Sequence, residues 1–172
     1  WKAFVDRSDD DGKTWNKSQE VEISQLEYKS GERTVGKDDS SIPVSEQSFY
    51  GRGVIQPTLW ESIPDQVHML LRSTEGMIYR SDSKDGGDTW TEAYATELPN
   101  NNSGIDMIRS EDGKLFLVYN PVGVNWGDRT PISLAVSKDD GKTWKKIRDL
   151  STGEGEFAYP AIIQDEDFLY IT

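Results

Sequence analysis

The side chains available in this chain narrow the chemistry that it could perform. It has no cysteine, which excludes disulfides, thiolate nucleophiles and cysteine-bound zinc. Its single histidine, His68, cannot form a multi-histidine metal site, and no calcium loop of the D-x-D-x-D-G type is clear, so no metal or other cofactor is expected. Arginine side chains gathered in one cleft could still bind an anionic sugar.

Composition and charge limit the class of protein. Of the 172 residues, 34% are hydrophobic and 10% aromatic, enough for the core of one domain. No apolar run approaches the ~18 residues of a membrane span. The formal net charge of −12 argues against nucleic acid and anionic membrane surfaces as partners. The absence of cysteine is compatible with cytoplasm or bacterial export, and a secreted or periplasmic location is favoured.

An octapeptide of the pattern S-x-D-x-G-x-T-W occurs three times, at spacings of 75 and 54 residues. Its Ser and Asp side chains can satisfy turn amides, its Gly accepts a positive φ, and its Trp can pack under the turn, as in a tight β-hairpin. The key positions are Ser8, Asp10, Gly12 and Trp15, then Ser83, Asp85, Gly87 and Trp90, and finally Ser137, Asp139, Gly141 and Trp144.

Short strands around these hairpins predict an all-β chain built from four-stranded propeller blades. The expected division is a half-blade over 1–30, a polar loop over 31–48, a blade over 51–98, a blade over 103–150 and a half-blade over 155–172. The last of these begins with a strand predicted over 157–164.

About three blades are too few to close a propeller, for which 4–8 is usual. Either this piece belongs to a longer chain, or two copies form a homodimer that closes a six-bladed ring. Both possibilities follow from the half-blades, whose strand edges would otherwise be exposed.

The repeated hairpin, known as the Asp-box or BNR repeat, resembles that of the sialidase (neuraminidase) superfamily of six-bladed β-propellers, and it also occurs in propellers that are not enzymes. The resemblance implies that the boxes are structural. It implies that Arg72 and Arg129, which lie 57 residues apart, bind the substrate carboxylate, and that Tyr159 is the nucleophile. The remaining arginine of the family that binds the substrate carboxylate, and the aspartate that acts as its general acid, would lie in blades outside this chain.

One position departs from the family pattern. Gln56 stands where the resemblance implies the glutamate that activates the tyrosine. A neutral amide cannot take the phenolic proton, and a tyrosine with a pKa of about 10 is a poor nucleophile at neutral pH without a base. Glu156 and Glu61 are candidate substitutes. Gln56 itself is expected to line the pocket.

Other polar residues have simpler explanations. Asn120, at a strand end, could contact sugar hydroxyls, and turn capping explains it equally well. His68 alternates within a strand and is expected to be packed. The run 100–103 is expected to be a loop.

Three functions remain open. The first is a sialidase-like exo-glycosidase, acting on a terminal sialic acid or other acidic sugar. The second is a carbohydrate-binding propeller without turnover. The third is an Asp-box propeller for protein interaction or assembly, in which Arg72 and Arg129 would not converge.

Overall fold

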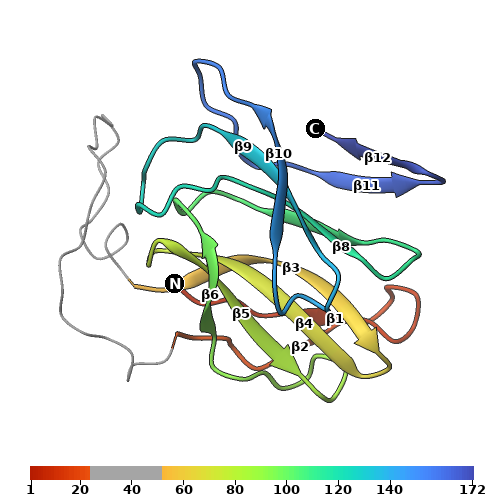
Figure 1. Ribbon diagram of the computed structural model, residues 1–172. Coiled ribbons are helices and arrows are strands. Elements are labelled where there is room, and N and C mark those ends of the chain that lie inside the picture. Colours follow the sequence, from red (N-terminus) through yellow and green to blue (C-terminus); the bar gives the residue numbers. More distant parts are fainter. Residues whose placement is uncertain (24–51) are drawn as a thin grey trace.

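The structure, a computed structural model, describes residues 1–23 and 52–172, and this part of the chain contains twelve β-strands and no helix (Figure 1). The predicted all-β class is therefore confirmed. The predicted loop 31–48 lies outside the described residues. Within the described ranges, no helix is found that could cross a membrane.

The strands follow the chain in an up-and-down order. They are β1 (Asp6–Arg7), β2 (Asn16–Lys17), β3 (Val54–Ile63), β4 (Gln66–Ser73), β5 (Met77–Ser83), β6 (Tyr94–Pro99), β7 (Asp106–Arg109), β8 (Leu115–Tyr119), β9 (Ile132–Ser137), β10 (Lys145–Ser151), β11 (Ile162–Asp165) and β12 (Phe168–Ile171).

These strands form four antiparallel sheets in the described part of the chain. β3 to β6 and β7 to β10 make two four-stranded sheets in sequence order, while β1–β2 and β11–β12 make two-stranded sheets. The first strands lie next to one another, since β3 contacts β7 and β7 contacts β11 (Figure 1). This is the arrangement of successive blades in part of a propeller, and it confirms the predicted fold class.

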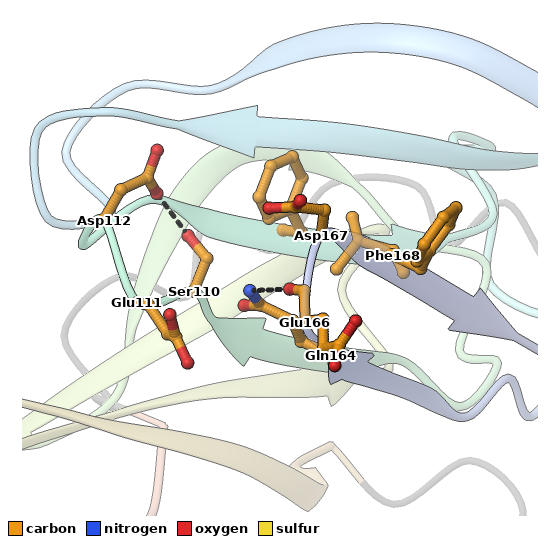
Figure 2. Close-up of a pocket in the computed structure, with 9 residues that line it drawn as sticks. Ser110, Glu111, Asp112, Gln164, Glu166, Asp167 and Phe168 are labelled. Atoms are coloured by element: carbon orange, nitrogen blue, oxygen red, sulfur yellow. Dashed lines mark hydrogen bonds between the residues drawn. The ribbon is translucent and has the colours of Figure 1, made fainter.

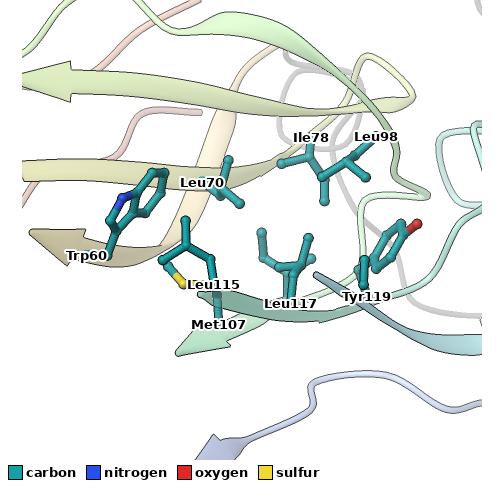
Figure 3. Packing of buried hydrophobic residues seen from close by; sticks show 10 residues of the cluster. Trp60, Leu70, Ile78, Leu98, Met107, Leu115, Leu117 and Tyr119 are labelled. Atoms are coloured by element: carbon teal, nitrogen blue, oxygen red, sulfur yellow. The ribbon is translucent and has the colours of Figure 1, made fainter. Parts of the chain in front are cut away.

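The largest core cluster lies between the two four-stranded sheets (Figure 3). The first sheet contributes Trp60, Leu70 and Ile78, and the second contributes Leu115 and Leu117. Alternate residues of each strand point to the same face, so one face of each sheet can be fully apolar. Burial of these side chains holds neighbouring blades together, at about 25 cal/mol per Å² of apolar surface removed from water.

The three octapeptides form the predicted hairpins with one hydrogen-bond network. In the second, Asp85 accepts hydrogen bonds from the backbone N–H and the hydroxyl of Thr89 at 2.9 and 2.5 Å. The Ser83 hydroxyl oxygen accepts the N–H of Gly87 at 2.9 Å, and Gly87 has a φ of +97° that favours glycine. The network of hydroxyls and amides lowers the pKa of Asp85 to about 2.

The tryptophans of the repeat do not all pack as predicted. The Trp90 indole N–H donates to the carbonyl of Gly87 at 2.9 Å, and the side chain is buried in the core cluster beside the N-terminal segment. Trp15 makes the same bond to Gly12 at 3.0 Å, but is 61% exposed. It lies on the two-stranded β1–β2 sheet, and the described clusters provide it with no core to enter.

The predicted strand 157–164 is too long at its start. The observed strand, β11, begins at Ile162. Tyr159 has a left-handed φ of 57°, which an extended strand does not accommodate, and Pro160 after it has no N–H to donate. Tyr159 therefore lies in the connection that precedes the strand.

Asp85 should make the stability of the protein sensitive to acid. Because its folded-state pKa is lowered from 3.8 to about 2, its contribution is complete above pH 4 and is lost as the pH falls through 2. We expect Asp85→Asn to be less stable than the wild type at pH 7, with the difference shrinking towards pH 2. Urea unfolding at both pH values tests this. A deficit that is equal at pH 7 and pH 2 would contradict it.

Candidate functional site

Four chain segments meet at one end of the sheets and bring several predicted site residues together. Gln56 lies near the start of β3 and Arg72 near the end of the antiparallel β4, so both lie at the same end of the first sheet. Asn102 precedes β7 and Tyr159 precedes β11. The Asp-box hairpins that follow β5 and β9 lie at the opposite end.

Arg72 is the centre of this group and is only 4% exposed. Its Nη1 donates to the Gln56 Oε1 at 2.7 Å and to the Tyr159 hydroxyl at 3.0 Å. Its Nε donates to the Asn102 Oδ1 at 3.0 Å. All three partners are neutral, and among the described residues the guanidinium has neither an ion-pair partner nor an acceptor for Nη2.

A β-bulge directs Gln56 towards Arg72. Ile55 pairs with Arg72 and Pro57 pairs with Leu71, so Gln56 between them has no partner of its own on β4. Its φ is 50°, a left-handed value that few residues other than glycine adopt. Bulges of this kind re-aim a side chain next to a site, and this one brings the Gln56 amide against the guanidinium.

The Tyr159 ring lies between the two predicted arginines. Its centroid is 5.7 Å from the Arg72 guanidinium carbon and 5.6 Å from that of Arg129. Both distances allow attraction between a cation and the ring face. Tyr159 is 54% exposed, so the ring is open to solvent as well as to the arginines.

The Tyr159 ring packs directly against Gly104, in the space that a side chain at this position would occupy. A Cβ at Gly104 would lie 2.7 Å from the Tyr159 Cδ1, closer than real side chains approach. Any larger residue at this position would push the ring away from Arg72.

The predicted substitutes for the family's glutamate do not contact Tyr159. Glu156 is largely exposed and faces Arg129, with 3.5 Å between its Oε2 and Nη1. Glu61 lies at the far end of β3, where it pairs with Val67, and its Oε1 accepts the N–H of Asp65 at 2.9 Å. The suggestion that Glu61 replaces the missing glutamate is therefore wrong.

Asn120 is placed differently from the prediction. It is fully buried, and its Nδ2 donates at 2.9 Å to the carbonyls of both Pro131 and Phe157. The expectation that it contacts sugar hydroxyls is corrected, because its amide group is enclosed by the protein. Instead it links the segments that carry Arg129 and Tyr159.

The loop 100–104 contains the site residues that sequence reasoning missed. Asn100, Asn101 and Asn102 are all buried. Asn101 Nδ2 donates to the carbonyl of Asp128 at 2.7 Å, next to Arg129, while Asn102 contacts Arg72. Three consecutive asparagines before a glycine were the available signal, but sequence alone does not distinguish an exposed turn from a buried polar loop.

His68 is packed, as expected, at a distance from the site. Its ring lies 4.9 Å from that of Trp60 and its Nδ1 is 2.5 Å from Asp82. Burial raises the pKa of Asp82, but hydrogen bonds from His68, Tyr94 and Arg80 outweigh it and lower the pKa overall. Burial and the neighbouring Asp82 raise the pKa of Tyr94 to about 12. This polar cluster stabilises the sheet.

A cavity of about 310 Å³ at the opposite end of the sheets has different chemistry (Figure 2). Four of its lining residues are carboxylates, Glu111, Asp112, Glu166 and Asp167, and it holds none of the predicted site residues. Its negative charge disfavours an acidic ligand. Over the described ranges, no group of three or more acidic or histidine side chains is placed to hold a metal ion.

Replacing Gly104 by Ala should displace the Tyr159 ring. The half-exposed ring can rotate outwards, so we expect a stability loss below about 1 kcal/mol together with loss of the hydrogen bond from Arg72. NMR of ring-labelled tyrosine, with Tyr159 assigned from Tyr159→Phe, measures the displacement. Gly153→Ala is the control, since no atom lies within 4 Å of a Cβ there. An unshifted Tyr159 resonance in Gly104→Ala would contradict the prediction.

Comparison with known structures finds the same fold in sialidases. Trypanosoma rangeli sialidase matches with a TM-score of 0.65 and 16% identity, over 98% of this chain and 24% of that one. The NanB sialidase of Streptococcus pneumoniae matches with a TM-score of 0.60 and 19% identity, over 93% and 22%. A Dyadobacter fermentans protein of unknown function matches with a TM-score of 0.64 and 20% identity, over 95% and 38%. This chain thus spans only 22% to 38% of the length of those chains.

A search of curated proteins finds no significant match to the chain, so the family assignment depends on a family model. The model of the BNR repeat-like domain matches residues 1–171, almost the whole sequence. The chain therefore belongs to the BNR repeat-like domain family, and it has the fold of part of a sialidase-type β-propeller.

Proposed function

We propose that this chain forms part of the active site of an exo-glycosidase that hydrolyses a terminal sialic acid or another acidic sugar. The observation that carries the proposal is the buried guanidinium of Arg72, held beside Tyr159 by neutral partners. A buried cation of this kind is costly unless an anion compensates it. A sugar carboxylate could supply that charge.

The second arginine supports an acidic ligand. Arg129 and Arg72 converge on the same ring, and arginine binds carboxylates in a planar, two-pronged geometry. Nη2 of Arg72 remains available as a donor. The convergence counts against the reading as an assembly propeller, in which the two arginines would be unrelated.

Tyr159 is the group proposed to act at the sugar. Its hydroxyl accepts a hydrogen bond from Arg72, and its side chain is half-exposed, so a ligand could reach it. One solved structure with this fold, Trypanosoma rangeli sialidase, is in complex with 2,3-difluorosialic acid as a covalent intermediate. We infer the corresponding reaction for this protein: the tyrosine oxygen attacks the anomeric carbon and loses its phenolic proton, while the glycosidic C–O bond breaks and the leaving oxygen takes up a proton to depart as an alcohol. Water then cleaves the bond between the sugar and the tyrosine and restores the phenol.

A second candidate is binding of the same acidic sugar without turnover. Gln56 favours it, because its amide oxygen accepts from Arg72 at 2.7 Å and cannot act as a base towards Tyr159. The carboxylate of Glu156, the other candidate base, is 78% exposed and directed to Arg129. In this case the arginines would retain the ligand and Tyr159 would only contact it.

Variants of Arg72 and Tyr159 separate these candidates. We expect Arg72→Met to bind N-acetylneuraminic acid or D-glucuronic acid with an affinity lower by at least about tenfold, as measured by calorimetry. Tyr159→Phe should keep its affinity for these sugars within about threefold of the wild type. It should no longer hydrolyse the 4-methylumbelliferyl glycosides of the same sugars. Arg109→Met is the control, because Arg109 bonds the Glu61 carbonyl at the other end of the sheet.

The outcomes are distinct. Binding that survives in Tyr159→Phe, with no hydrolysis by any variant when this chain is assayed within its complete propeller, supports the binding-only candidate. Equal loss of binding in Arg72→Met and Arg109→Met would contradict an acidic-sugar site at Arg72.

We propose that the rest of the propeller lies in a longer chain, with completion of the ring by a second copy as the alternative. Its docking face on this chain would be the β11–β12 hairpin, where Ile163, Phe168 and Tyr170 are exposed on one face. The two-stranded β1–β2 sheet is the other half-blade.

The mass in solution distinguishes the two arrangements. Because this chain spans only 22–38% of the solved chains compared above, we expect light scattering to give the mass of one copy, 19.4 kDa. A mass of twice that value would contradict this and support a ring closed by two copies.

A further inference from the structure

We propose that Asn102 is a positioning residue for Arg72, and that its neutrality keeps the charge of the guanidinium available to an anion. The inference rests on the proposed function for the identity of the ligand, but not for the presence of an anion site. It concerns a buried loop residue that lies 30 positions from the arginine that it holds.

The geometry fixes the guanidinium from two sides. Asn102 Oδ1 accepts the Nε hydrogen at 3.0 Å, while Gln56 and Tyr159 accept the two hydrogens of Nη1 at 2.7 and 3.0 Å. These bonds determine both the plane and the rotation of the group, and none of them uses the hydrogens of Nη2. Pre-orientation of this kind removes the need to order the side chain when a ligand binds.

The loop that carries Asn102 is tied to the end of β4. Asn100 Oδ1 accepts the N–H of Asn102 at 3.0 Å and that of Ser73, the residue after Arg72, at 3.3 Å. Asn102 itself has a left-handed φ of 64°, a conformation that asparagine, aspartate and glycine tolerate better than other residues. The position of the Asn102 amide relative to Arg72 is thus set by the backbone on both sides.

The same loop reaches the other arginine and the tyrosine. Asn101 binds the carbonyl of Asp128, next to Arg129, and Gly104 lies under the Tyr159 ring. This one buried loop therefore contacts or flanks all three residues of the site, Arg72, Arg129 and Tyr159. A change in this loop would alter binding without touching a residue that contacts the ligand.

The choice of an amide over a carboxylate is what indicates a role beyond structure. An aspartate would fit the same backbone, accept the same Nε hydrogen and form a buried ion pair with Arg72. For stability alone it would serve at least as well, since Asn102 is 1% exposed and its Nδ2 has no acceptor among the described residues. The ion pair would, however, cancel the charge that an anionic ligand needs.

The test compares Asn102→Asp with Asn102→Gly, two replacements that both tolerate the positive φ. The probe is acetate, the simplest carboxylate, added at constant ionic strength while the Tm is followed, with affinity taken from the titration. We expect acetate to raise the Tm of the wild type. Asn102→Asp should have a higher Tm than the wild type without acetate, and an acetate affinity lower by at least about tenfold.

Asn102→Gly removes the acceptor without adding charge. We expect it to lower the Tm, and to weaken acetate binding less than Asn102→Asp does, because the cation remains but is no longer held. Gln164→Glu, which adds one negative charge on β11 near its turn to β12 and away from Arg72, should respond to acetate as the wild type does.

Opposite changes in stability and acetate affinity in Asn102→Asp are a result that a purely structural role would not produce. An acetate affinity in Asn102→Asp equal to that of the wild type would overturn the proposal, as would the absence of any acetate response in the wild type. If the response is present and is lost in Asn102→Asp, but neither acidic sugar binds more tightly than acetate, the inference stands and the proposed function fails.

Discussion

The hydrogen bonding of one buried cation organises the functional end of this protein. Arg72 enters from the end of β4 and meets side chains from the β3 bulge, the loop before β7 and the connection before β11. Each hydrogen bond reaches a different segment of the chain, so the guanidinium also links neighbouring sheets. Because its partners are neutral, this link leaves a net positive charge in a protein that is otherwise strongly acidic.

Backbone conformation contributes as much to this arrangement as side-chain chemistry. Gln56, Asn102 and Tyr159, the three acceptors of the Arg72 hydrogens, all have a left-handed φ. Such values are uncommon outside glycine and cluster at functional sites, where the surrounding structure holds them. In each case the unusual φ interrupts the regular backbone and directs a side chain towards Arg72, which regular extended strands could not do for three adjacent segments.

The sequence predicted the parts of the protein that depend on local pattern. The S-x-D-x-G-x-T-W hairpins follow from turn chemistry, and the four-stranded sheets follow from their spacing and from alternating apolar residues. The convergence of Arg72 and Arg129 near Tyr159 was expected only from the resemblance to sialidases. The buried roles of Asn102 and Asn120 were missed, because burial of a polar loop depends on segments distant in sequence. Trp15 was mispredicted for the same reason, whereas the start of β11 was mispredicted because of the left-handed φ of Tyr159 and the proline that follows it.

The Asp-boxes and the Arg72 group lie at opposite ends of the same strands. The hairpin network that gives this family its recognisable signature therefore has no contact with the groups that would define its chemistry. Members could diverge in ligand while the hairpins stay constant, and a match to the repeat carries no information about the ligand. Classification of such proteins by activity would need to compare the bulge, the asparagine loop and the segment before β11, which together form an independent signature.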